Sequence, residues 1–236
     1  MMIFHRSKGQ LLSGGLPMLA LMMLTLRPAV SAEPPADDGW IRLFNGQNLD
    51  GWEIHSGKAT YRVEHAAIIG QTTKGSPNTF LITQESFRDF ELMFEVYLED
   101  NELNSGVQIR SKLQEGEYGG RVYGPQVEIE ASPGQSGWIY GEVAGGWQSP
   151  EPESDDSSVN QNSYFKNQEW NQYRVLAVGR HIRTWINGHP VADLMYDPDR
   201  YQDNPEGFIG LQVHNVGDRG PFQVRWRNIF IKPISQ

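Results

Sequence analysis

The sequence predicts an all-β protein in which two antiparallel sheets pack face to face as a sandwich. Three observations favour this class. Apolar and polar residues alternate with period two in many short segments, turn-forming residues recur between those segments, and no long stretch has helical periodicity. A chain of 236 residues is also an ordinary length for one β-sandwich domain.

The clearest strand is Asp89–Asp100, which reads DFELMFEVYLED. Its even positions from Phe90 to Leu98 are apolar and three of its odd positions are glutamates, so one side is expected to be buried and the other polar. Similar alternation surrounds several later segments. We expect the two sheets to bury between them Phe94, Val107, Val127, Ile129, Leu211 and Val213. The segment Ile182–Val191 is predicted to be a hairpin that turns at Asn187-Gly188.

The first 32 residues have the features of a secretory signal peptide. A basic start precedes the apolar run Leu16–Leu26, and Val30-Ser31-Ala32 fits a cleavage site. We therefore expect a signal peptide at 1–32, a linker at 33–38 and a single domain at 39–236. This predicts a secreted or periplasmic protein with no membrane span after cleavage. The alternative is an uncleaved anchor, for which the apolar run is short.

Composition narrows the classes of partner. The formal net charge is −9, and every acidic residue follows Ala32, so the predicted mature protein is acidic. Because an acidic surface repels phosphate backbones, we expect no nucleic-acid partner. The chain has no cysteine, which excludes disulfides and thiolate metal sites. No cofactor motif is present and none is predicted, although a divalent cation such as calcium, held by loop oxygens, stays open.

Two glutamates form the sharpest candidate for chemistry. In Gln126-Val127-Glu128-Ile129-Glu130, strand geometry places Glu128 and Glu130 on one face about 6.6 Å apart. Two carboxylates at such a spacing can serve as acid and base in cleaving a glycosidic bond, and their repulsion raises the pKa of one of them. The alternative is an ordinary solvent-facing strand that carries two glutamates.

Other polar residues are candidates for the same surface. We expect one concave surface to gather Arg110, Gln126, Glu128, Glu130 and His214. In it, Arg110 would hold a carboxylate or grip hydroxyls, and His214 would carry a proton. Glu95, on the polar side of its strand, and Gln212, on the same side as His214, are further candidates for substrate binding.

The stretch Gly145–Gln168 is long, polar and irregular. A loop of this length in a compact domain is usually functional or disordered. Trp147 lies within it. Because an aromatic ring on a loop can close over a sugar, Trp147 is a candidate for substrate binding; burial beneath the loop is the alternative.

Several segments, taken in order, resemble one bacterial family. Residues 41–52, IRLFNGQNLDGW, are similar to its opening LFNGKDLSGW, and residues 227–234, RNIFIKPI, to its closing FRNIRIKPL. The intermediate segments that match are Asp89–Leu92, Asn104–Arg110, Glu169–Asn171, Asn187-Gly188 and Gly210–Gln212. Together they span about residues 39–234. On these segments the chain resembles the 3-keto-disaccharide hydrolases, once classed as a domain of unknown function.

The resemblance implies a concanavalin-A-like lectin/glucanase sandwich, or jelly roll, that acts on glycosides oxidised at C3. A 3-keto group acidifies the C2 proton, so a base can remove it and the C1 substituent can leave; hydration then completes net hydrolysis. The family often has YEVQILD where this chain reads PQVEIE at 125–130. The polar positions match but Glu and Gln differ, which leaves open whether Glu128 or Glu130 is the base.

Three functions are therefore open. The first is an exported enzyme that cleaves 3-keto-disaccharides, supplied by an upstream glucoside 3-dehydrogenase. The second is a non-catalytic carbohydrate-binding module or lectin-like domain, since one fold serves both. The third is a structural domain of the cell surface.

Overall fold

The computed structural model describes residues 38–143, 146–149, 161–195 and 205–235. All lie within the compact unit Glu33–Gln236. The predicted signal peptide and residues 33–37 of the predicted linker lie outside the described residues. The described residues form strands, turns and loops, and they include no helix capable of crossing a membrane.

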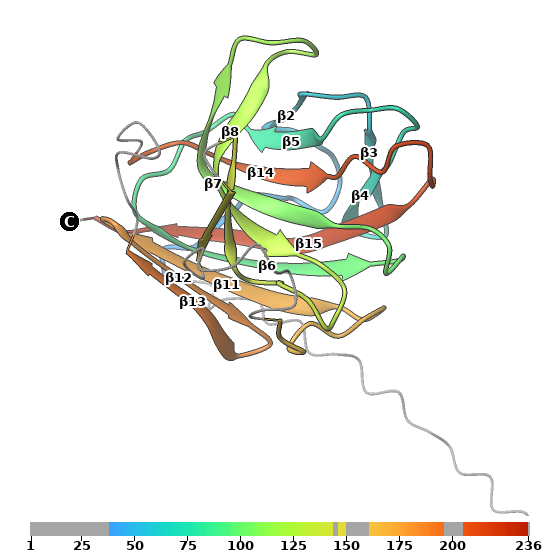
Figure 1. Cartoon of the computed structure of the whole chain (residues 1–236). Helices are drawn as coiled ribbons and strands as arrows, with labels where there is room; N and C mark the ends of the chain where they lie inside the picture. The colour runs from blue at the N-terminus through green and yellow to red at the C-terminus, as the bar shows by residue number, and fades with distance from the viewer. Residues whose placement is uncertain (1–37, 144–145, 150–160, 196–204, 236) are drawn as a thin grey trace, which may run out of the picture. The chain divides into compact units, whose positions relative to one another are not determined.

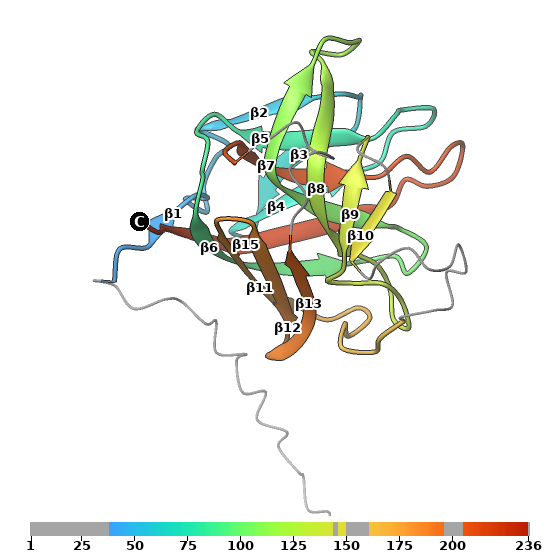
Figure 2. The same cartoon turned by 60° about the vertical axis from the view of Figure 1, so that its left-hand side comes forward.

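Two antiparallel sheets make up the described fold, and Figures 1 and 2 show them as two layers. The eight-stranded sheet has the order β13-β12-β11-β6-β15-β4-β3, with β1 paired to β15. Its strands are β1 (Ile41–Arg42), β3 (Thr60–Glu64), β4 (Ala67–Gln71), β6 (Phe90–Leu98), β11 (Asn171–Val178), β12 (His181–Ile186), β13 (His189–Met195) and β15 (Gln223–Pro233).

The seven-stranded sheet has the order β10-β9-β8-β7-β14-β5-β2. Its strands are β2 (Trp52–His55), β5 (Thr79–Thr83), β7 (Ser105–Gln114), β8 (Arg121–Ile129), β9 (Ile139–Glu142), β10 (Gly146–Ser149) and β14 (Phe208–Val213). The predicted all-β sandwich of two antiparallel sheets is confirmed.

The core lies between the sheets, and the alternation in the sequence explains it. Phe94 is 1% exposed, and the other five residues predicted to be buried have no exposure. Removing their apolar side chains from water provides the main drive to stack the sheets. The predicted turn is also confirmed: Asn187 and Gly188 have φ of 50° and 83° and connect β12 to β13.

A β-bulge changes the direction of β7 at its middle. Arg110 has a φ of 47°, and the pairing with β8 shifts between Gln108 and Lys112. Beyond this point the β7–β8 hairpin bends toward β2, where Ser56 N–H donates to Tyr118 O at 2.9 Å. Figure 2 shows the tip of this hairpin beyond the neighbouring strands. The bulge lets one hairpin contribute to the sheet and also reach across its outer side.

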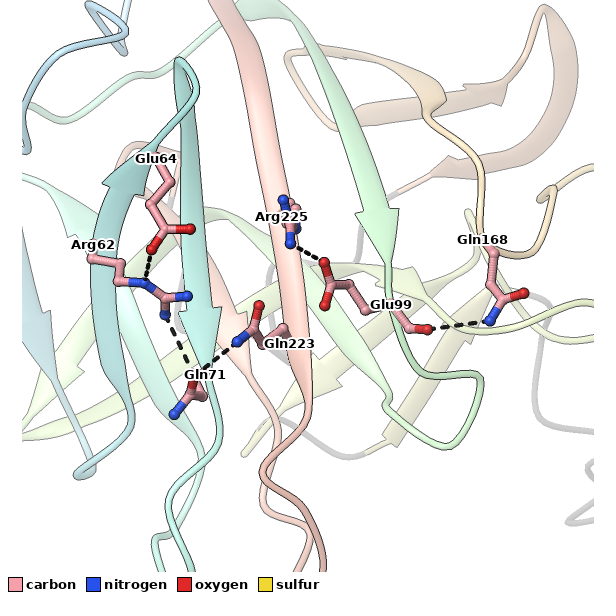
Figure 3. A network of polar contacts seen from close by, with 7 residues as sticks. All are labelled: Arg62, Glu64, Gln71, Glu99, Gln168, Gln223 and Arg225. Carbon is pink, nitrogen blue, oxygen red and sulfur yellow. Dashed lines mark hydrogen bonds and ion pairs between the residues drawn. The ribbon is translucent and has the colours of Figure 1, made fainter.

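The outward face of the eight-stranded sheet is polar. Figure 3 shows hydrogen bonds and ion pairs that connect β3, β4 and β15 to the end of β6. Arg62 Nε lies 2.6 Å from Glu64 Oε1, and Gln223 Nε2 donates to Gln71 Oε1 at 2.8 Å. These contacts lie on the far side of the sandwich from the candidate site described next.

Candidate functional site

Glu128 lies near the end of β8, on the side of the seven-stranded sheet that faces away from the core. Its neighbours Val127 and Ile129 point into the core and have no exposure. Alternation therefore turns Gln126 and Glu128 to the opposite side, which we call the Glu128 face. Glu128 is nevertheless only 4% exposed. It does not lie on the simple solvent-facing strand that was the alternative interpretation of the sequence.

A chain of hydrogen bonds leads to the Glu128 carboxylate. Ser111 Oγ donates to Gln108 Oε1 at 2.6 Å, and Gln108 Nε2 donates to Gln126 Oε1 at 2.8 Å. Gln126 Nε2 then donates to Glu128 Oε2 at 3.1 Å, and Asn104 Nδ2 donates to Oε1. Each amide points its donor group toward Glu128, so the arrangement suits an ionised carboxylate.

Burial and repulsion work against that ionised form. The pKa of Glu128 is raised to about 8: burial raises it most, the hydrogen bonds from Asn104 and Gln126 oppose this, and the charges of Glu130 and Glu142 add to the rise. No cation contributes to this balance among the described residues. A carboxylate with such a pKa is a stronger base than an ordinary glutamate, yet it is partly ionised near neutral pH.

Two further carboxylates lie on this side of the sheet. Burial raises the pKa of Glu130. The hydrogen bond that Glu130 accepts from Gln135 N–H at 3.2 Å lowers the same pKa. Burial also raises the pKa of Glu142, opposed by a hydrogen bond from Asn78 and the charge of Arg121. Glu130 follows directly after β8, two residues beyond Glu128, and its charge acts on the Glu128 carboxylate.

Gln212 and His214 reach the same face from β14. Gln212 pairs with Gly106 of β7, and Gly106 pairs in turn with Glu128. His214 follows the strand, and its Nδ1 donates to Asn215 O at 2.7 Å, because a carbonyl only accepts. Burial lowers the pKa of His214. The ring is therefore neutral at pH 7, with Nε2 as an acceptor.

Trp147 lies in the same cross-strand row as Gln126. Gln126 pairs with Tyr140 of β9, and Tyr140 pairs with Trp147 of β10. The two aromatic rings meet edge to face, with centroids 5.4 Å apart. Trp147 is half-buried. The Glu128 face therefore ends in an aromatic pair at one edge of the sheet.

Arg110 does not join these residues, which corrects the expectation that it lies on the same surface and holds one of the two glutamates. The bulge at its own position breaks the alternation that the expectation assumed. Its guanidinium pairs with Asp89 Oδ1 at 2.9 Å and also donates to Arg88 O and Gly179 O. Arg110 thus connects the two sheets at one end of the sandwich, where a buried ion pair is already satisfied.

Glu95 also lies away from the Glu128 face, so the expectation that it lines the same surface is wrong. It belongs to β6 in the eight-stranded sheet, on that sheet's outward side. There its carboxylate accepts a hydrogen bond from Arg227 Nε at 2.6 Å. Alternation correctly predicted that Glu95 faces away from the core, but alternation does not assign a strand to a sheet.

Sequence analysis missed four polar residues of the site. Asn104 lies in the segment Asn104–Arg110 that carried the family resemblance, and Gln108 is the polar position of that same strand. Ser111 lies beyond the bulge, so no alternation pattern points to it. Glu142 shares the outward side of β9 with Tyr140, two residues before it, and this spacing could have been recognised in the sequence.

The described part of the chain holds no group of three or more His, Asp or Glu side chains placed to bind a metal ion. A calcium ion held by loop oxygens therefore stays an untested expectation.

The domain's sequence matches one family model. The model describes a 3-keto-alpha-glucoside-1,2-lyase-like domain and matches residues 39–232. The chain belongs to this family. Membership agrees with the resemblance carried by the opening and closing segments, and it supports a carbohydrate-active protein. A comparison with curated proteins finds no match.

Solved structures share the fold of this family member at low identity. A glycosyl hydrolase-like protein from Parabacteroides distasonis ATCC 8503 has 19% identity and a TM-score of 0.58, over 84% of this chain and 95% of its own. A protein of unknown function with a galectin-like fold, from Bacillus subtilis, has 11% identity and a TM-score of 0.56, over 82% and 94%.

A third similar structure is the carbohydrate-binding module CBM66 from Bacillus subtilis. It has 12% identity and a TM-score of 0.50, over 77% of this chain and 95% of its own. At these identities the three structures establish the jelly-roll fold alone. The fold occurs in both hydrolases and binding modules, so the choice between them depends on the site.

Proposed function

We propose that the protein cleaves 3-keto-glycosides by elimination followed by hydration, with Glu128 as the base. The observation that carries this proposal is a buried carboxylate whose pKa is raised to about 8 while amides keep it oriented as an acceptor. A carboxylate with a raised pKa removes a proton next to a ketone more readily than an ordinary exposed glutamate does. Family membership supplies the substrate class for which this base is suited.

In the first step Glu128 accepts the C2 proton, and the electron pair passes into an enolate at C2, C3 and the keto oxygen. Collapse of the enolate forms the C1–C2 double bond and breaks the bond from C1 to the leaving oxygen. Glu130, whose pKa is raised by burial, donates the proton that completes the leaving alcohol. The first product is the alcohol and the second is an unsaturated 3-keto sugar.

In the second step water adds to that unsaturated sugar. Its oxygen bonds to C1, C2 receives a proton from the Glu128 carboxyl group after that group has exchanged its proton with solvent, and the remaining water proton restores Glu130. Nε2 of the neutral His214 accepts a hydrogen bond from the water or a hydroxyl. The net reaction is hydrolysis, and both carboxyl groups return to their starting states.

The same proposal includes export and a supply reaction. The segment at 1–32 would direct the chain out of the cytoplasm, and mass spectrometry of the secreted protein is expected to find Glu33 at its N-terminus. Full-length chain in the membrane fraction would contradict this. The substrate must first be oxidised at C3, so a glucoside 3-dehydrogenase reaction has to precede this one.

The decisive test is turnover of a 3-keto-glucoside by the purified protein in deuterated water. Elimination and hydration predict release of the alcohol, transient absorbance of the enone and one deuterium at C2 of the product. Release of the alcohol without deuterium at C2 would contradict proton abstraction and indicate direct displacement at C1.

A second candidate function is sugar binding without catalysis. The Tyr140–Trp147 pair favours it, since aromatic faces are common platforms for sugars. Under this function the wild-type protein would bind a disaccharide in calorimetry but release no alcohol from its 3-keto form.

A further inference from the structure

A cavity of about 420 Å³ lies on the Glu128 face, beneath the far half of the β7–β8 hairpin. Its volume is in the range of small-molecule sites in proteins. Glu128 does not line it. The lining residues that matter here are Asn78, Phe80, Tyr118, Val122, Glu142 and Asn215.

The lining combines apolar and polar groups as a sugar requires. Phe80 and Val122 pack together and are each 1% exposed, so they form an apolar floor. Tyr118 is 43% exposed and forms an aromatic wall at the hairpin. Asn78 donates to Glu142 and accepts from Asn215 N–H at 2.8 Å. One aromatic surface with a few fixed polar groups is the usual composition of a carbohydrate subsite.

The register of the strands places this cavity next to Glu128 without direct contact. Glu128 N–H donates to Trp138 O, and Glu142 stands four residues beyond Trp138 on β9, about 13 Å along the strand. The charge of Glu142 nevertheless acts on Glu128. A ligand that reacts at Glu128 would therefore enter the cavity by extending along the sheet beyond its reacting sugar.

Gln212 lies on the strand between the cavity and Glu128. It pairs with Phe80 of the cavity floor on one side and with Gly106, the neighbour of Glu128, on the other. It has no exposure, yet neither Nε2 nor Oε1 has a hydrogen-bond partner. Burying an amide without hydrogen-bond partners destabilises the fold, so we infer that this side chain has a role other than stabilising it. One amide can donate to one sugar oxygen and accept from one hydroxyl.

We propose that the cavity is the subsite for the leaving group of the glycoside, and that Gln212 binds the sugar at the junction between the cavity and Glu128. This inference rests on the proposed function for the identity of the substrate. Because Gln212 is covered, sugar binding has to move the groups above it. The subsite would make the enzyme selective for disaccharides over glycosides with small leaving groups.

The cavity is tested with Tyr118→Ala on two substrates. For a 3-keto-disaccharide we expect KM to rise about three- to tenfold, as for the loss of one aromatic contact. For methyl 3-keto-glucoside, whose leaving group is too small for the cavity, we expect no change. Leu113→Ala is the control, since Leu113 is 37% exposed in the same hairpin but does not line the cavity. Equal effects of Tyr118→Ala on both substrates would overturn the subsite.

Gln212→Leu tests the junction. It removes two polar atoms that have no partners, so the midpoint of thermal unfolding is expected to stay or rise. The value of kcat/KM is expected to fall about ten- to a hundredfold on both substrates. The control is Gln71→Leu, which removes hydrogen bonds to Arg62 and Gln223 and should lower the midpoint without affecting turnover. Full activity of Gln212→Leu, or a parallel loss of stability and activity, would overturn the role of Gln212.

If the proposed function itself is wrong, the assays give a different result. In that case the wild type turns over neither substrate, and calorimetric titration with maltose, an unoxidised glucose disaccharide, decides the subsite. Binding that weakens in Tyr118→Ala but not in Leu113→Ala supports the cavity as a sugar site. Equal binding by all three proteins, or none by the wild type, overturns it.

Discussion

The two sheets carry polar outer faces that differ in how their charges are satisfied. On the eight-stranded sheet, acids pair with bases across neighbouring strands: Arg225 with Glu99, and Arg227 with Glu95 at 2.6 Å (Figure 3 shows the first of these pairs). On the Glu128 face, the carboxylate of Glu128 is held by two amides, and its charged neighbours are acids. One face neutralises its charges and the other concentrates like charges.

The comparison shows that Glu128 differs from a paired glutamate by its burial and by the lack of a cation among the described charges that act on it. Glu99 keeps about a third of its side chain exposed and faces an arginine, while Glu128 is 4% exposed and faces amides. An amide orients a carboxylate but does not compensate its charge as an arginine does. The residue type is the same in both cases, and the environment makes the difference.

The largest expected difference comes from making the same Glu→Gln substitution on each of the two faces. Glu128→Gln removes the proposed base and is expected to lower turnover of a 3-keto-glucoside by about two to four orders of magnitude. Glu99→Gln makes the same chemical change in the paired network and should leave turnover within about twofold, as is usual away from a site. Similar activities of the two variants in steady-state assays would remove the catalytic assignment of Glu128.

The pH dependence sharpens the comparison, because activity and stability should move in opposite directions. The base form of Glu128 grows as pH rises, so kcat/KM is expected to increase with pH toward about 8, and to fall again where Glu130 loses the proton that it donates. The unfolded chain loses this proton near pH 4.5, while the folded chain keeps it until about 8. Between these values the folded state holds the extra proton, and stability falls as pH rises.

Chemical denaturation of wild type and Glu128→Gln at several pH values isolates this contribution. The advantage of Glu128→Gln is expected to grow by at most about 1.4 kcal/mol per pH unit between pH 5 and 8, and to stay constant above. Glu130, Glu142 and His214 also titrate abnormally, but they are present in both proteins. A stability difference that does not depend on pH would contradict the raised pKa of Glu128.

A smaller effect is expected from the amide that holds Glu128. Asn104→Ala removes a hydrogen bond that favours the ionised form, so the pKa of Glu128 should rise. The rising limb of the pH–activity profile would then shift to higher pH. Carbon NMR of the Glu128 carboxyl group measures the same shift without substrate. A downward shift would show that Asn104 stabilises the protonated form.

The smallest effect belongs to the paired face. Arg225→Gln breaks the ion pair with Glu99, whose two side chains are about one-third exposed. Exposed pairs of this kind contribute little, so we expect a loss of less than about 1 kcal/mol in unfolding free energy and unchanged kinetics. A strong loss of activity would mean that the two faces communicate, which their separation by the core does not predict.

Much of the fold was predictable because alternation depends on local geometry. Phe94 and Val127 were placed in the core correctly, and the Asn187-Gly188 turn was recognised from the dipeptide. The same reasoning placed Gln126, Glu128 and Gln212 away from the core. It failed at Arg110, where a bulge inverts the pattern, and no residue preference at that position announces a bulge.

The sequence by itself determined which side of each strand is apolar, since side-chain direction follows from position along the strand. Only the tertiary structure decided which strands share a sheet, because pairing joins segments that are distant in the chain. That decision separates Glu95 from Glu128, brings Asn104 to the Glu128 carboxylate, and buries it. The raised pKa is a property of this assembled environment, because desolvation depends on every element packed around the group.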